Sequence, residues 1–273
     1  MRAILTDVTK CIGCEKCVAA CVTENKLPPA LPARWTRDDG LSAERFTAIE
    51  RKGTSNVRKQ CRHCLEPACA SACPVGALHK TPEGPVVYDS SKCLGCRYCM
   101  MACPFGIPRY QWGSTVPYVR KCTMCHENRV KLGRQPACTE ACPTQATIFG
   151  ERTELLAEAH RRLGVDPARY QPAVWGETDV GGTSVLYLSP IPLDFLGVGR
   201  VQHERALPEL TVTAMEAVPP VFVGVGAVLA GVRWIIGRRM KLADGSSPHG
   251  GSHDGSHGGS GTGSRGGSKE KKP

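Results

Sequence analysis

Sixteen cysteines occur in this chain of 273 residues, and all of them fall into four groups of four. Three of the groups end in a Cys-Pro pair, at residues 73, 103 and 142. The groups are Cys11, Cys14, Cys17 and Cys21; Cys61, Cys64, Cys69 and Cys73; Cys93, Cys96, Cys99 and Cys103; and Cys122, Cys125, Cys138 and Cys142. This pattern predicts sixteen thiolate ligands for four [4Fe–4S] clusters, and hence a chain that carries electrons.

The spacing within the groups indicates ferredoxin-like loops. The first and third groups have the spacing C-x2-C-x2-C-x3-C, and Pro104 completes the bacterial ferredoxin run in the third. The second group widens its middle interval to four residues and the fourth to twelve, which leaves the number of ligands at four. In two-cluster ferredoxins the fourth cysteine of a run binds the other cluster, so the groups should work in pairs.

The segments between the groups predict which of them pair. Apolar stretches at 77–80 and 85–89 flank the sequence TPEG at 81–84, which suits a hairpin turn, so the second and third groups should form one module. Similar strand-like segments at 2–7 and 146–149 flank the first and fourth groups. The predicted fold class is α+β, with one bacterial-ferredoxin-like two-cluster module nested inside another.

Exchange of the fourth ligand within each pair predicts four ligand sets, although the spacing leaves the partition within a pair open. The sets are Cys11, Cys14, Cys17 and Cys142; Cys21, Cys122, Cys125 and Cys138; Cys61, Cys64, Cys69 and Cys103; and Cys73, Cys93, Cys96 and Cys99.

His63 and His126 lie inside groups that already have four cysteines, so we expect them to be filler or surface residues. Lys10, Lys92 and Lys121 adjoin cluster-loop cysteines, where they either raise local potentials or are exposed and screened.

Two other uses of cysteine fit the pattern less well. Zinc sites often contain C-x2-C pairs, but they seldom use the run C-x2-C-x2-C-x3-C-P. Disulfides are typical of small secreted chains with an even number of cysteines, but thiols three residues apart are too close to join distant segments. The cluster interpretation is therefore preferred to both.

Composition supports the same interpretation. The formal net charge is +10, while four oxidised clusters with their thiolates would contribute roughly −2 each, so most of the basic excess compensates the clusters. No basic stripe with interleaved aromatic residues indicates nucleic-acid binding. Aromatic residues make up only 5% of the chain, so the clusters should replace much of an apolar core and the apo-protein should not fold.

The segment after the last cysteine group begins with a predicted surface helix at 153–163, which has helical apolar spacing. Residues 167–216 are irregular and rich in Pro and Gly, apart from a predicted strand at 183–188. We expect 151–216 to be an extension that docks on a partner.

The stretch AVPPVFVGVGAVLAGVRWII at 217–236 has the length and composition of a membrane-spanning helix. Pro219 and Pro220 are expected in its first turn, where proline is tolerated, and Arg233 is near enough to the end to reach the headgroups. Trp234 suits the interfacial belt. The alternative, a buried core helix, would need an apolar core that the rest of the chain lacks.

Flanking residues predict the orientation of this helix. Arg238, Arg239 and Lys241 follow the span directly, and the positive-inside rule therefore places the C-terminus in the cytoplasm and the cluster domain outside. Residues 1–10 have no signal-peptide or twin-arginine pattern, so export should depend on a partner that carries the signal. Residues 238–273 form a Gly/Ser/His-rich tail that we expect to be disordered.

The cysteine groups, in this order and spacing, resemble those of the four-cluster iron–sulfur (beta) subunits of membrane-bound respiratory oxidoreductases, and the resemblance extends over about 3–240. The helix at 217–236 and the sequence GGTSVLYL at 181–188 are similar to the beta subunit of formate dehydrogenase N and to the electron-transfer subunit of membrane-bound nickel–iron hydrogenases. The sequence LSPIPLDFL at 188–196 resembles the hydrogenase subunit more closely, whereas the missing signal fits the formate dehydrogenase subunit better.

The resemblance implies an electron-transfer subunit that performs no bond chemistry itself. Its partners would be a molybdenum or tungsten formate dehydrogenase subunit, or a nickel–iron hydrogenase subunit, and a cytochrome b subunit that reduces quinone in the cytoplasmic membrane. The alternatives are a soluble polyferredoxin-like carrier whose apolar stretch docks a partner protein, and a zinc scaffold. The expected domains are 1–150 for the four clusters, 151–216 for docking, 217–237 for the single membrane span and 238–273 for the tail.

Overall fold

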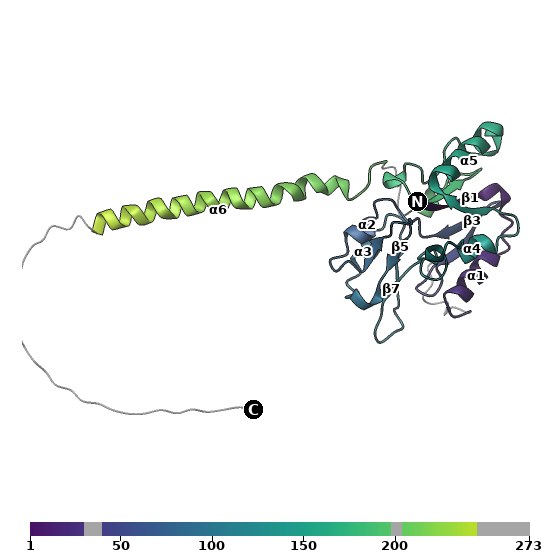
Figure 1. Ribbon diagram of the computed structural model, residues 1–273, viewed down its shortest axis with the longest axis horizontal. Helices are drawn as coiled ribbons and strands as arrows, with labels where there is room; N and C mark the ends of the chain where they lie inside the picture. Colours follow the sequence, from purple (N-terminus) through teal and green to yellow (C-terminus); the bar gives the residue numbers. More distant parts are fainter. Residues whose placement is uncertain (30–39, 198–203, 245–273) are drawn as a thin grey trace, which may run out of the picture. The chain divides into compact units, whose positions relative to one another are not determined.

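The computed structural model describes residues 1–29, 40–197 and 204–244, so the predicted tail beyond 244 lies outside the described residues. The chain divides into two compact units, Met1–Glu216 and Ala217–Pro273 (Figure 1). The helices and strands, in chain order, are β1 (Arg2–Asp7), α1 (Lys16–Glu24), β2 (Thr47–Lys52), β3 (Ser55–Gln60), α2 (Ala68–Ser71), β4 (Leu78–Lys80), β5 (Val86–Tyr88), α3 (Tyr98–Ala102), β6 (Arg109–Tyr110), β7 (Val119–Arg120), α4 (Ala137–Glu140), β8 (Thr147–Glu151), α5 (Arg152–Val165), β9 (Val185–Leu188) and α6 (Glu209–Asp244).

A three-stranded sheet in the order β8-β1-β9 joins the beginning of the chain to the segments that follow the last cysteine group (Figure 1). β1 pairs with β8 in antiparallel register, with Ile4 opposite Phe149. On its other edge β1 pairs with β9 in parallel register, with Ile4 opposite Val185. The predicted strands at 2–7, 146–149 and 183–188 are thereby confirmed as strands, with ends shifted by at most two residues.

Both faces of β1 are buried because each is covered by a different part of the chain. Ala3 and Leu5 belong to an apolar cluster that includes Leu155 and Ala159 of α5. Ile4, whose side chain points to the opposite face, packs in a second cluster with residues of β3 and the fourth cysteine loop. The predicted surface helix at 153–163 is thus confirmed as α5, which covers one face of the sheet.

Three antiparallel strand pairs, β2–β3, β4–β5 and β6–β7, lie between the cysteine groups in the described part of the chain. β4 and β5 pair in antiparallel register across the turn at 81–84, as the sequence predicts. β2 and β3 form a second antiparallel hairpin that the sequence analysis did not identify. β3 is buried on both faces at its C-terminal end, so polar and apolar residues alternate only in part along this hairpin. The sequence signal of a half-buried strand is therefore weak here. This hairpin positions several of the side chains described below.

α6 is longer than the predicted span at both ends, and the predicted position of its prolines is wrong. It continues to Asp244, so the prediction of a disordered tail is wrong for 238–244. The helix begins at Glu209, so Pro219 and Pro220 lie in its interior and not in its first turn. The residues before the apolar run, ELTVTAME, also form helix, and interior prolines are tolerated in membrane helices because neighbouring groups satisfy the freed carbonyls. Among the described residues, this helix is the one long and apolar enough to cross a membrane.

Candidate iron–sulfur cluster sites

The four cysteine loops share one backbone feature. In each C-x2-C pair that opens a group, the residue before the second cysteine has a left-handed conformation, with φ of 68° at Gly13, 49° at His63, 70° at Gly95 and 58° at Met124. Left-handed φ is costly for a side chain such as that of His63 or Met124 and persists where the surroundings require it. The turn directs backbone N–H groups at sulfur: Gly95 N lies 3.4 Å from Cys93 Sγ and Met124 N 3.3 Å from Cys122 Sγ.

The loops of the first and third groups begin in the same way. Asp7 ends β1 and caps a 3-10 turn by accepting hydrogen bonds from the backbone N and hydroxyl of Thr9, at 3.1 and 2.6 Å. Asp89 follows β5 and accepts the corresponding bonds from Ser91, at 2.9 and 2.6 Å. Each turn leads directly into the first cysteine of its group. The two halves of the cluster domain therefore repeat one local structure.

The three Cys-Pro corners also repeat. The residue three positions after each cysteine has a left-handed φ and donates its N–H to the carbonyl of that cysteine, at 3.3 Å for Gly76, 3.0 Å for Gly106 and 3.3 Å for Gln145. Burial disfavours the Cys73 thiolate, but backbone N–H groups after the proline outweigh it and lower the pKa of Cys73. The same balance lowers the pKa of Cys142. The corners at Cys73 and Cys142 therefore favour a thiolate before any iron is bound, whereas burial raises the pKa of Cys103 at the third corner.

The first group departs from this pattern because no proline follows Cys21. α1 continues through Cys21 to Glu24, and Asn25 supplies the missing donor. Its Nδ2 lies 2.9 Å from the Cys21 carbonyl oxygen and 3.6 Å from Cys21 Sγ. Burial of Cys21 raises the pKa of its thiol to about 12, so this cysteine needs a cation or a metal to become a thiolate at neutral pH.

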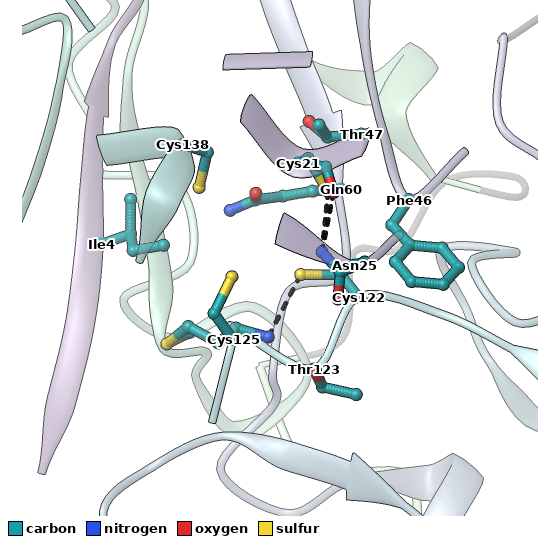
Figure 2. Close-up of a pocket in the computed structure, with 11 residues that line it drawn as sticks. Ile4, Cys21, Asn25, Phe46, Thr47, Gln60, Cys122, Thr123, Cys125 and Cys138 are labelled. Atoms are coloured by element: carbon teal, nitrogen blue, oxygen red, sulfur yellow. Dashed lines mark hydrogen bonds between the residues drawn. The ribbon is translucent and has the colours of Figure 1, made fainter. Parts of the chain in front are cut away.

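Eight of the cysteines surround two cavities. One cavity is lined by four cysteines of the first and fourth groups together with Gln60 and apolar residues such as Ile4 (Figure 2). A second cavity is lined by four others from the same two groups together with Arg58. The cysteines are Cys21, Cys122, Cys125 and Cys138 at the first cavity, and Cys11, Cys14, Cys17 and Cys142 at the second.

The remaining eight cysteines also gather in fours. Burial raises the pKa of the Cys64 thiol, and the next largest contributions come from Cys61, Cys103 and Cys69. Burial likewise raises the pKa of Cys99 to about 11, with further contributions from Cys73, Cys93 and Cys96. The structure therefore brings together four quartets, and each quartet combines three cysteines of one group with one from another.

The donor sets fit cubane clusters. Within the described part of the chain, no group of three or more His, Cys, Asp or Glu side chains is arranged around a single-ion position. A cubane needs a wider arrangement, since each thiolate binds a different iron. Four soft thiolates around a mostly apolar cavity, with backbone N–H groups directed at sulfur, are the donor chemistry of a [4Fe–4S] cluster.

Buried and half-buried cations lie beside these quartets, and the sequence analysis missed two of them. Lys121 is only 3% exposed, and its Nζ donates to the carbonyl oxygens of Val86 and Cys122. Lys80 Nζ donates to the carbonyl oxygen of Cys64 at 2.8 Å, and burial lowers its pKa to about 8. Arg58 is fully buried and donates to Cys138 Sγ at 3.2 Å. Lys10 and Lys92, by contrast, are exposed.

Neither histidine inside the cysteine groups is a surface residue. His63 is completely buried, and its Nδ1 accepts a hydrogen bond from Val86 N at 2.9 Å. Burial and the neighbouring lysines, Lys121 and Lys80, lower the pKa of His63 well below its ordinary value, so the ring is neutral. His126 is 6% exposed and lies 3.1 Å from a carboxylate oxygen of Glu83. The expectation of a surface position is therefore wrong for both histidines, and His63 connects the second cysteine loop to β5.

Comparisons with known proteins agree with this chemistry. Residues 54–152 match a family of 4Fe–4S dicluster domains. A protein of Nitratidesulfovibrio vulgaris (strain Hildenborough) is 42% identical over 257 residues, which cover 88% of this chain and 68% of that protein. The hydrogenase-2 operon protein HybA of Escherichia coli O157:H7 is 35% identical over 238 residues, which cover 72% of this chain and 73% of HybA.

A third relative is the iron–sulfur subunit of the nitrate-inducible formate dehydrogenase of Escherichia coli (strain K12). It is 38% identical over 206 residues, which cover 68% of this chain and 67% of that subunit. The sixteen cysteines of this chain fit four [4Fe–4S] clusters. The chain therefore belongs to the family of 4Fe–4S iron–sulfur subunits of respiratory oxidoreductases, in which it serves as an electron-transfer subunit.

Proposed function

We propose that this chain conducts electrons between a catalytic subunit of the formate dehydrogenase type and a cytochrome b subunit that reduces quinone in the membrane. The observation that carries the proposal is the gathering of all sixteen cysteines into four quartets on loops with a common backbone. A [4Fe–4S] cluster in each quartet would supply reversible one-electron storage. The chain itself holds the clusters, excludes water from them and supplies hydrogen bonds to their sulfurs.

The proposed ligand sets are the four quartets expected when the fourth ligand is exchanged within each pair of groups. Support comes from the two cavities. Each is lined by the first three cysteines of one group and the fourth cysteine of its partner group. The proposed nesting of one two-cluster module inside another is supported by the pairing of β1 with β8, which encloses the β4–β5 hairpin within the sequence. The repeated Asp7 and Asp89 turns support it further.

We also propose that α6 crosses the membrane once, with the cluster domain outside and the C-terminus in the cytoplasm. The apolar side chains of its central part, including Val221 and Phe222, are exposed, as lipid contact requires. The cations Arg238, Arg239 and Lys241 follow the apolar run, which supports the orientation. The proposed domains remain 1–150, 151–216 and 217–237, and the proposed tail follows the end of α6 at Asp244.

A catalytic partner of the nickel–iron hydrogenase type is the second candidate. The observation in its favour is the alignment with HybA, which covers 72% of this chain against 68% for the formate dehydrogenase subunit. The sequence at 188–196, which resembles the hydrogenase subunit, includes the buried residues Leu188, Leu193 and Leu196. The cluster sites would be the same in either complex.

The test is dye reduction by the complex purified from membranes in mild detergent through this chain. Reduction driven by formate supports the first candidate and predicts molybdenum or tungsten in the preparation, whereas reduction driven by hydrogen assigns the second. Iron analysis of this chain should give about sixteen atoms. A zinc-containing, colourless chain, or full recovery in the supernatant after carbonate extraction, would refute the membrane-bound electron-transfer role.

A further inference from the structure

Arg58 is a buried cation in an unusual position. Its side chain is 1% exposed, and within the described residues no carboxylate forms an ion pair with it. Its Nη2 donates to Cys138 Sγ at 3.2 Å and to Gln60 Oε1, while its Nη1 is buried without a hydrogen-bond partner. A buried guanidinium needs negative charge nearby, and thiolates of the cysteine quartets are what surrounds it.

The guanidinium lies between two quartets. Cys138 lines the first cavity, whereas Arg58 itself lines the second, the one bounded by Cys11, Cys14, Cys17 and Cys142. A guanidinium keeps its positive charge over the whole physiological pH range. Arg58 is therefore a permanent positive charge shared by both cavities.

Gln60 is the second polar side chain of this arrangement, and it lines the first cavity. It follows Arg58 by two residues on β3, so both side chains lie on the same face of the strand. Its side chain lines the first cavity, where Figure 2 shows it among the cysteines, and its Nε2 is buried without a partner. Arg58 and Gln60, which line the second and the first cavity, thus each keep one buried N–H group, on Nη1 and Nε2, without a hydrogen-bond partner.

The scaffold holds this pair in place. Arg58 Nε donates to Thr47 Oγ1 at 3.3 Å across the β2–β3 hairpin. The buried hydroxyl of Tyr187, on β9, donates to the Arg58 carbonyl oxygen at 2.7 Å. The ladder of β2 and β3 places Thr47 opposite Gln60. Donors fixed in this way need no reorganisation when the charge beside them changes.

We propose that Arg58 and Gln60 set the reduction potentials of the two cluster sites formed by the first and fourth cysteine groups, and that Arg58 acts on both. Each site gains one electron, and therefore one negative charge, when an external donor reduces it. A fixed cation and N–H···S hydrogen bonds stabilise the reduced form more than the oxidised form, so they raise the potential. This inference rests on the proposed ligand sets.

A matched set of variants tests the inference in the full-length chain, purified anaerobically in detergent with its clusters. Arg58→Gln removes the charge and Arg58→Lys keeps it, while Gln60→Leu removes the amide donors. Arg51→Gln is the control, because Arg51 lies on the same hairpin but is 62% exposed and pairs with Glu15. Potentiometric titrations followed by electron paramagnetic resonance, with iron analysis, give the potential of each cluster.

We expect Arg58→Gln to move two of the four potentials to more negative values and to leave the other two unchanged. Arg58→Lys should move the same two less, Gln60→Leu should lower at least one of them, and Arg51→Gln should move none. In wild-type chain labelled with 15N-arginine, pulsed resonance should detect a nitrogen coupling to a reduced cluster, and Arg58→Lys should abolish it. A merely structural arginine would not produce these selective effects.

Four unchanged potentials in an iron-replete Arg58→Gln chain would overturn the inference and leave the proposed function intact. If the Arg58→Gln chain does not retain its iron, the reduction potentials of Arg58→Lys and Gln60→Leu test the inference instead. Wild-type potentials in both variants would overturn it. A wild-type chain without four [4Fe–4S] signals would instead overturn the proposed function, and the inference with it. An equal shift of all four potentials would also contradict the inference, since Arg58 adjoins only two sites.

Discussion

Asp7 and Arg162 form an ion pair, with 3.0 Å between Asp7 Oδ2 and Arg162 Nη1, although 155 positions separate them in the sequence. The carboxylate side chain is 1% exposed and the guanidinium side chain 15%. The other oxygen of Asp7 caps the turn that leads into Cys11. One carboxylate therefore holds the first cysteine loop and also attaches α5 to the sheet.

Arg162→Gln should destabilise the cluster domain. Removing one partner of a buried ion pair leaves the other charge uncompensated, and we expect a loss of about 3 kcal/mol because Asp7 keeps the hydrogen bond from Tyr170. Thermal unfolding under anaerobic conditions measures the effect. Arg161→Gln is the control, since Arg161 is 63% exposed and its solvent-screened pair with Glu158 should contribute little to stability. Equal losses in the two variants would contradict a role for the Asp7 pair.

Gly176→Ala should also destabilise the domain. Gly176 has a φ of 94°, and an added Cβ would lie 2.7 Å from the Val185 carbonyl oxygen and closer still to the Thr183 hydroxyl. Backbone strain and the clash at β9 should together cost about 2–4 kcal/mol. Gly164→Ala in α5 is the control, because its Cβ would meet open space and alanine favours helix by roughly 0.5–1 kcal/mol. Comparable stability of the two variants would refute the packing argument.

Removal of iron should unfold the cluster domain and leave α6 helical. Without metal, burial keeps the thiols of Cys21 and Cys69 protonated, with pKa values raised to about 12, and leaves the Arg58 charge uncompensated. Anaerobic chelation followed by circular dichroism checks this expectation. The near-ultraviolet signal should vanish while a helical far-ultraviolet signal remains. Persistent near-ultraviolet structure in an iron-free chain would show that the apolar clusters suffice for folding.

Deletion of α6 should release the chain from membranes. A chain that ends at Pro208 keeps every cysteine but lacks the apolar helix, so it should appear in the supernatant after carbonate extraction and retain about sixteen iron atoms. A chain that ends at Asp244 keeps the helix and is the control, which should stay in the pellet. If the shorter chain also stays in the pellet of cells that lack the partner subunits, α6 is not the membrane anchor.

Much of the cluster domain could be predicted because iron ligation constrains local sequence. The cysteine spacing predicts the loops, and the turn at 81–84 predicts the β4–β5 hairpin, since both depend on residues close together in the chain. The quartets that combine distant groups followed from the known exchange of a fourth ligand. The start of α6 was missed because polar helix formers precede the apolar run and resemble a loop in composition.

The positions of the charged residues beside the clusters could not be predicted in this way. Lys121 adjoins a cysteine in the sequence and is buried, whereas Lys10 and Lys92 have the same kind of neighbour and are exposed. Arg58 precedes Cys61 by three residues, yet its guanidinium donates to Thr47 and to Cys138, which is far away in the sequence. A long side chain reaches several environments from one backbone position, so its neighbours decide between them.

The amino-acid sequence by itself determined the number of clusters, the family and the apolar helix, because these depend on residue type and on spacing along the chain. The tertiary structure decided which cysteines share a cavity wall, that β9 lies beside β1, and that one guanidinium stands between two quartets. Those features depend on contacts between residues far apart in the sequence, such as Ile4 and Val185. Their physical cause is burial, which removes water as a partner and leaves buried charges to be satisfied by the groups that folding brings near.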